Sequence, residues 1–123
     1  MGVYFVKCFY LTRGFDVEKL LQNTLLYDFY GELLTDKQKN IYDLYFFDDM
    51  TMEEIGERLE ITRQSVNFSL KQAQKNLENF EEKLGLVALN GQVKSHIAAL
   101  GRALSGHDVQ RARDVHSQLR ELF

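Results

Sequence analysis

The sequence contains no proline, the residue that most strongly interrupts helices. A chain of 123 residues without proline can form long helices, and this one is rich in Leu, Glu, Lys and Gln, which favour them. Its hydrophobic fraction of 45% is enough for a core, and its length suits one domain, or a small domain with a helical appendage. We therefore predict an all-α protein.

The single cysteine, Cys8, cannot form a disulfide within the chain, and a lone thiol fits a reducing cytoplasm. We do not expect Cys8 to be catalytic, because Lys7 is the only obvious basic residue near it. The chain also lacks the roughly 18 consecutive apolar residues of a membrane span. The first stretch, "MGVYFVKCFYLTRGF", has no basic n-region, unlike a secretory signal. We predict a cytoplasmic protein without membrane insertion, with residues 1–15 as an N-terminal arm, disordered or strand-like.

Sequence patterns for catalysis and for cofactors are missing as well. The three histidines, His96, His107 and His116, are spaced too widely for a zinc motif. No glycine-rich phosphate loop is present, and the many carboxylates look like charges on helix surfaces. We therefore predict a non-enzymatic protein with no cofactor and no metal site.

A strong excess of positive charge is also lacking. The formal net charge is −3, from 15 basic and 18 acidic residues, which predicts no strong non-specific attraction to phosphate backbones. Residues 35–85 carry seven basic and eleven acidic residues, a net charge of −4. Within them, however, residues 62–76 contain Arg63, Lys71 and Lys75 and no acid. This local basic strip could support a modest phosphate footprint.

Apolar periodicity and capping residues divide the chain into helices. The caps expected to start them are Asp16, Thr35, Thr51, Thr62 and Asp108, and Gly85 and Gly106 are expected to end two of them. A loop is expected at Asp48 and Asp49, because acids suit the C-terminal end of a helix poorly. The domains predicted are residues 16–85, a helix-turn-helix domain, and residues 86–123, a C-terminal helical hairpin or extension.

Three apolar patterns predict how these helices pack. The first helix is expected to be largely core through Leu20, Leu21, Leu25, Phe29 and Leu33, extended by Leu26, Tyr30 and Leu34. A heptad seam runs along the long helix after Thr62, and it predicts lengthwise packing on another helix. Its members are Val66, Leu70, Ala73, Leu77, Phe80, Leu84 and Val87. The two C-terminal helices each carry an apolar stripe, which predicts either a homodimer through them or closure within one chain.

Residues 51–77, "TMEEIGERLEITRQSVNFSLKQAQKNL", have the pattern of a helix-turn-helix. The positions that such a motif buries are occupied by Ile55, Gly56, Leu59, Ile61, Val66 and Leu70. Glycine inside a short helix is costly, so we expect another backbone segment to lie against Gly56. The outward residues of the second helix are then candidates for nucleic-acid contact: Thr62, Arg63, Gln64, Asn67, Phe68, Lys71, Gln72 and Lys75. The alternative is a solvated polar face of an ordinary helical hairpin.

The segments "LLYDFYGELLTDKQ", "DLYFFDD" and "ITRQSV", between about residues 24 and 86, resemble those of the YlxM-type helix-turn-helix proteins, the UPF0122 family. The sequence is also similar to region 4 of bacterial sigma factors, where an "L-T-x-x-Q" helix leads into a helix-turn-helix. The resemblance implies an all-helical cytoplasmic protein that is encoded near signal-recognition-particle genes and that acts in that pathway or regulates it. The sequence departs from the general motif at Glu60, where a turn glycine is usual.

Two hypotheses for function follow. The first is a regulatory or accessory protein of the signal recognition particle, with the particle's GTPase or its RNA as partners. The second is a sequence-specific DNA-binding transcriptional regulator that reads duplex DNA through residues 62–75. The acids around the basic strip weigh against the second hypothesis without excluding it.

Overall fold

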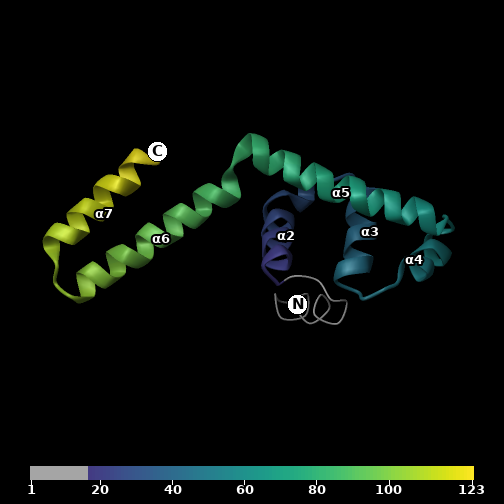
Figure 1. Cartoon of the computed structure of the whole chain (residues 1–123), viewed down its shortest axis with the longest axis horizontal. Coiled ribbons are helices and arrows are strands. Elements are labelled where there is room, and N and C mark those ends of the chain that lie inside the picture. The colour runs from purple at the N-terminus through teal and green to yellow at the C-terminus, as the bar shows by residue number, and fades with distance from the viewer. Residues whose placement is uncertain (1–16) are drawn as a thin grey trace. The chain divides into compact units, whose positions relative to one another are not determined.

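The computed structural model describes residues 17–123, and within that range it contains helices and no strand (Figure 1). The elements are α2 (Val17–Tyr30), the 3-10 helix η1 (Gly31–Leu33), α3 (Asp36–Phe46), α4 (Met52–Leu59), α5 (Arg63–Leu84), α6 (Leu86–Ser105) and α7 (Val109–Glu121). The all-α prediction is confirmed. The expected N-terminal arm, Cys8 and the Asp16 cap lie outside the described residues. The chain divides into two compact units, the first ending at Leu84 and the second covering Gly85–Phe123.

Side-chain caps start the helices at the places that the sequence predicts. Thr35 forms a capping box with Gln38: the Gln38 N–H donates to Thr35 Oγ1 over 3.2 Å, and the Thr35 N–H donates to Gln38 Oε1 over 3.3 Å. Thr51, Thr62 and Asp108 each accept a hydrogen bond from the backbone N–H three residues on, at 3.0 to 3.1 Å. Each cap satisfies an N–H that the first turn of a helix would otherwise leave unpaired.

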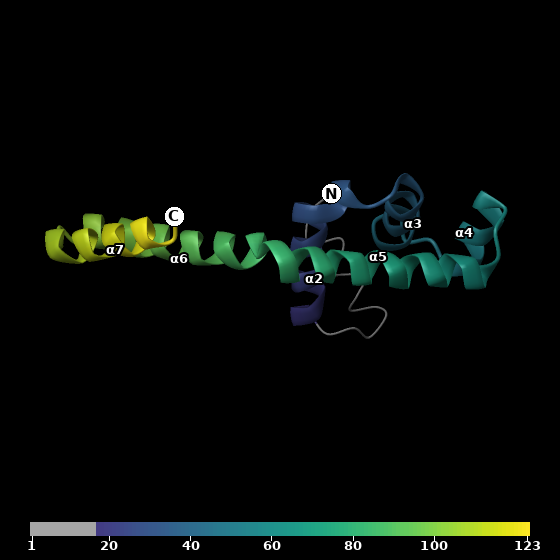
Figure 2. The ribbon, with the colours of Figure 1, turned by 90° about the horizontal axis from the view of Figure 1, so that it is seen from above.

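The core of the first unit forms where α2, α3 and α4 each pack against α5 (Figure 1). Seen from above, α5 runs past all three of them (Figure 2). Polar contacts also join α2 to α5: the Tyr30 hydroxyl donates to Glu81 over 2.6 Å, and the Gln74 amide donates to Asn23 over 2.9 Å. Among the described residues of this unit, the largest fully buried side chains are Tyr30, Leu20, Ile41, Ile55, Leu77 and Val66.

The expectation that α2 is core on most of its surface is wrong. Leu20, Leu26, Tyr30 and Leu34 are buried, whereas Leu21 and Leu25 are 41% exposed, Phe29 is 39% exposed and Leu33 is 57% exposed. Residues of a helix follow one another at about 100° around its axis. Leu21, Leu25 and Phe29 therefore lie on the side of α2 away from the buried Tyr30. The eight apolar residues form two opposite faces rather than one.

The heptad seam that was expected to continue to Val87 ends at Leu84. Gly85 adopts the left-handed conformation, with φ of 62°, and Val87 belongs to the next helix, α6. Four members of the seam, Val66, Leu70, Ala73 and Leu77, are buried, but Leu84 is 54% exposed. The glycine that ends the helix therefore also ends the seam, because the backbone turns there.

The second unit is a hairpin of α6 and α7, which pack against each other and lie side by side in Figure 1; in Figure 2, α7 overlaps α6. The turn between them contains Gly106, as predicted, and His107, whose φ is 56°. Only Ala103 and Val115 are buried among the apolar residues of this unit. A two-helix unit with so little buried surface leaves most of its apolar side chains partly or fully exposed.

No helix among residues 17–123 is long and apolar enough to cross a membrane.

Candidate nucleic-acid interface

The helix-turn-helix consists of α4, a three-residue turn and α5, and Gly56 lies where the turn passes closest to α4. A Cβ atom on Gly56 would lie 2.8 Å from the carbonyl oxygen of Ile61, closer than side-chain carbons approach backbone atoms. The Ile61 N–H also donates to the Gly56 carbonyl over 2.9 Å. The expectation of a backbone segment against Gly56 is confirmed. The absence of a side chain there allows the tight crossing from α4 to α5.

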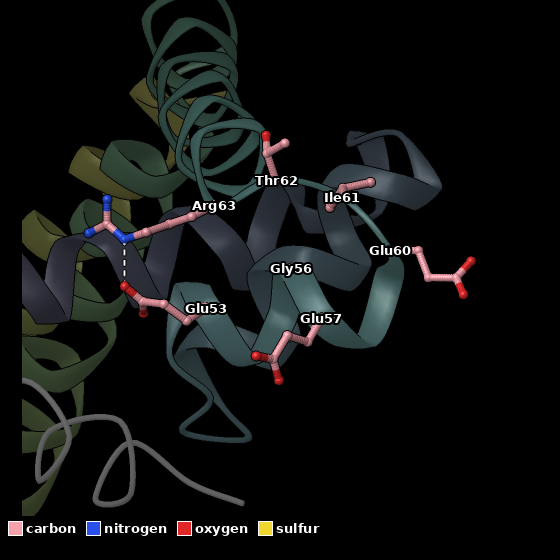
Figure 3. A pocket seen from close by; sticks show the side chains of 7 residues that line it. All are labelled: Glu53, Gly56, Glu57, Glu60, Ile61, Thr62 and Arg63. Atoms are coloured by element: carbon pink, nitrogen blue, oxygen red, sulfur yellow. Dashed lines mark hydrogen bonds and ion pairs between the residues drawn. The ribbon is translucent and has the colours of Figure 1, made fainter.

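Glu60 ends α4 in the left-handed conformation, with φ of 58° and ψ of 42°. That conformation costs a residue with a Cβ about 1 kcal/mol or more relative to glycine. The turn therefore has the usual geometry of a glycine turn, although the residue is glutamate. The Glu60 side chain points outward from the turn (Figure 3).

The outward face of α5 carries half of the predicted contact residues. Because the buried residues Val66, Ala73 and Leu77 define the inner side, the 100° step places the opposite residues on the outer side. These outer residues, which we call the α5 strip, are Gln64, Phe68, Lys71 and Lys75, and all four are exposed. Phe68 is 68% exposed, so its ring is accessible to a ligand.

The other four predicted residues lie at the edges of this strip or are already engaged. Asn67 and Gln72 are half-buried, and the Gln72 amide donates to Asn76 over 3.5 Å. The Thr62 hydroxyl is used as the cap of α5. Arg63 is turned toward α4, where its Nε donates to Glu53 Oε1 over 2.6 Å (Figure 3).

The ion pair between Arg63 and Glu53 changes the charge at the start of α5. The backbone N–H of Glu53 and the Arg63 side chain both hydrogen-bond its carboxylate and hold the pKa of Glu53 below its ordinary value. Glu53 therefore stays ionised. The cation that a DNA-reading helix would present at its first turn is neutralised by an acid of the preceding helix.

A hollow of about 430 Å³ lies beside this pair, between α4, the turn and the start of α5 (Figure 3). Three acids, Glu53, Glu57 and Glu60, line it together with Arg63. In a helix-turn-helix the first helix approaches the phosphate backbone, which these acids would repel. Acids around the basic strip were expected from the sequence, but their gathering beside Arg63 was not. The spacing of Glu53 and Glu57, one helical turn apart, was the signal that these two share a side of α4.

A second polar cluster joins α2 to α3, away from the α5 strip. The Tyr27 hydroxyl donates to the Asp43 carboxylate, and the Tyr27 ring stacks on Tyr42 with ring centroids 4.6 Å apart. Burial and the hydrogen bond to Asp43 raise the pKa of Tyr27. Lys39 pairs with Glu32 over 2.5 Å nearby. These contacts hold α2 and η1 against α3, and both α2 and α3 pack against α5.

Among residues 17–123, no group of three or more His, Cys, Asp and Glu side chains could hold a metal ion. The α5 strip is a polar and basic helix face. Beside it lie Glu53, Glu57 and Glu60, which we call the acidic border.

Comparison with known proteins agrees with this architecture. Residues 17–114 match the family UPF0122, described as "Putative helix-turn-helix protein, YlxM / p13 like". A UPF0122 protein of Thermoanaerobacter sp. (strain X514) is 46% identical over 91 residues, which cover 74% of this chain and 75% of that protein. A UPF0122 protein of Listeria welshimeri is 35% identical over 107 residues, which cover 85% of this chain and 97% of that protein. The chain therefore belongs to the UPF0122 family of YlxM / p13-like helix-turn-helix proteins.

Proposed function

We propose that this protein is a non-enzymatic regulatory or accessory protein of the signal recognition particle pathway, and that its α5 strip contacts nucleic acid. The observation that carries the nucleic-acid contact is the composition of that strip. Lys71 and Lys75 supply charge for phosphates, Gln64 supplies an amide, and Phe68 supplies an exposed ring on which a base can stack. The assignment to the pathway rests on the resemblance to YlxM-type proteins.

The acidic border favours RNA and protein partners over deep docking in duplex DNA. A helix that enters the major groove must bring the preceding helix close to phosphates. Here that helix presents Glu53 and Glu57, and the turn presents Glu60. An RNA loop or end with unstacked bases can reach Phe68 without passing these acids.

The second candidate function is a sequence-specific DNA-binding transcriptional regulator. It is favoured by the helix-turn-helix geometry itself and by Gln64, whose amide can pair with adenine in the major groove. Arg63 could also contact guanine, but it would first have to leave Glu53.

One experiment separates the two functions. Fluorescence anisotropy with signal-recognition-particle RNA and with a pool of duplex DNA, side by side at moderate salt, gives both affinities. Binding of the RNA supports the first function, and so does, in a separate titration, binding of the particle's GTPase or a change in its GTP hydrolysis. Preferential selection of one duplex over random DNA supports the second function instead.

Variants then test the α5 strip. Replacing both Lys71 and Lys75 with Ala should weaken RNA binding and reduce the magnitude of the slope of log K against log salt by about 1.4, since each lost phosphate contact to a single strand removes about 0.7. The matched control is Lys83→Ala, an exposed lysine in the last turn of the same helix but outside the strip. Equal losses in both proteins would assign the effect to general charge and reject the strip.

A further inference from the structure

The α6–α7 hairpin has an apolar surface on one side. In α6, Val93, Ile97, Leu100 and Leu104 recur at steps of three and four, so they form one row along the helix. Ile97 is 56% exposed and Leu104 is 61% exposed. In α7, Ala112 and Leu119 are half-buried, and Val109 at its start and Phe123, two residues beyond its end, are exposed.

Helical geometry places the two rows on the same side of the hairpin. Ala103 and Val115, the two buried residues, mark where the helices face each other. We measure rotation about each helix axis in the direction of the chain. The α6 row is then rotated by about 100° from Ala103, and the α7 row by roughly 40° to 120° from Val115. Because the helices run antiparallel, these two rotations turn toward the same side. We call the combined surface the hairpin face.

Basic residues border the hairpin face. By the same geometry, Lys94 lies at its α6 edge, and Arg113 and Arg120 lie at its α7 edge. Asp114 and Glu121 lie on the other side of α7. Residues 85–123 carry five basic and three acidic residues, a net charge of +2. Two copies of this face pressed together would bring basic edges against each other, so it suits a partner whose apolar stripe has acidic neighbours.

The outward face of α2 has that chemistry. Leu21, Leu25 and Phe29 form an exposed row at four-residue steps, on the side away from the core. Glu18 and Asp28 lie on the same side of the helix. Residues 17–84 carry eight basic and fourteen acidic residues, a net charge of −6. A helix that is apolar on two opposite faces is typical of one that is covered on both.

We propose that the protein forms a homodimer in which the hairpin face of each molecule docks on the outward face of α2 of the other molecule. Two such contacts, related by a two-fold axis, close the assembly without leaving either apolar surface open. This gives a specific form to the self-association expected from the apolar C-terminal helices. It does not depend on the proposed function, because the α5 strip takes no part in it.

Sedimentation velocity from 1 to 100 µM tests the proposal. The wild-type chain should sediment as a dimer, and added salt should weaken the dimer because the borders are charged. Leu25→Asp and Ile97→Asp, both at exposed positions, should each raise the dissociation constant at least tenfold. Phe68→Ser, at an exposed apolar residue outside both surfaces, is the control and should leave the dimer intact.

The charged borders allow a rescue experiment. Arg113→Glu combined with Arg120→Glu should weaken the dimer, and adding Glu18→Lys and Asp28→Lys to the same chain should restore it. A monomer at 100 µM for the wild-type chain overturns the proposal, and this is also the result expected if the faces are covered within one chain. A dimer that survives Leu25→Asp but not Ile97→Asp overturns it too, because the contact would then be hairpin to hairpin.

Discussion

The guanidinium of Arg63 donates from Nε to the carboxylate of Glu53, over 2.6 Å, across the turn of the helix-turn-helix (Figure 3). Both partners are exposed to solvent: 59% of the Arg63 side chain and 62% of the Glu53 side chain are accessible. An exposed pair of this kind adds little stability, so its main effect is on the charge that α5 presents to a ligand.

Removing the acid should therefore strengthen nucleic-acid binding. In Glu53→Gln, Arg63 is released and one repulsive charge is lost, and we expect a severalfold increase in affinity for RNA at low salt. Fluorescence anisotropy measures it. The control is Glu54→Gln, which removes the same charge from the neighbouring position of α4. An equal gain in both variants would mean that net charge, and not the release of Arg63, sets the affinity.

Gly56→Ala should destabilise the first unit. The added Cβ would lie 2.8 Å from the Ile61 carbonyl oxygen, and a backbone atom cannot move away as easily as a side-chain end. We expect a loss of about 1–3 kcal/mol in the free energy of unfolding, measured by urea titration with circular dichroism. Gly101→Ala, in α6 with no atom within 4 Å of the new Cβ, should instead stabilise its helix by roughly 0.5–1 kcal/mol. A Gly56→Ala variant with the same free energy of unfolding as the wild type would show that the turn can shift away from the new Cβ.

Glu60→Gly should stabilise the turn. Glu60 has φ of 58°, which glycine adopts freely, so the substitution removes strain of about 1 kcal/mol. Glycine also raises the conformational entropy of the unfolded chain, which offsets part of this gain. We expect a small net gain and a higher melting temperature. The paired control is Glu57→Gly, an exposed helical position where glycine should cost about 1 kcal/mol. A loss of stability in Glu60→Gly would indicate that its side chain makes a favourable contact.

The raised pKa of Tyr27 predicts an effect of alkaline pH. The folded state holds the proton more tightly than the unfolded state, so the stabilisation by Tyr27 is fully present below its ordinary pKa of 10.0 and is lost as pH rises through the folded value. Tyr27→Phe also loses the hydrogen bond to Asp43 and should be less stable than the wild type at neutral pH. The difference should shrink by up to about 1.4 kcal/mol per pH unit above pH 10.

Chemical denaturation of both proteins from pH 7 to pH 11 measures this difference. The comparison cancels the titration of lysines, because both chains contain the same ones. A difference that stays constant up to pH 11 would contradict the raised pKa of Tyr27, to which burial and the hydrogen bond to Asp43 both contribute.

The features that could be predicted from the sequence are those that depend on neighbours along the chain. Thr35, Thr51 and Thr62 cap helices through groups three residues away, and Gly56 is conspicuous because glycine is costly inside a helix. The end of α5 at Gly85 was also visible as a glycine, although the heptad pattern on either side of it suggested a longer seam.

Contacts between helices could not be predicted in this way. Arg63 and Glu53 lie ten residues apart on different helices, and their pairing depends on the angle at which α4 crosses to α5. The two apolar faces of α2 could not be separated either. Periodicity shows that Leu21 and Leu25 share a side, but the position of α5 decides whether that side is buried.

The hydrogen bonds from Tyr30 to Glu81 and from Gln74 to Asn23 each join residues 51 positions apart. A ribosome makes α2 long before it makes α5, so the apolar residues of α2 emerge before the helix that covers them exists. The first unit can close only when the end of α5 has left the ribosome. Until then, Leu20, Leu26 and Tyr30 form an exposed apolar segment of the growing chain, and truncation before residue 81 should leave a product that aggregates.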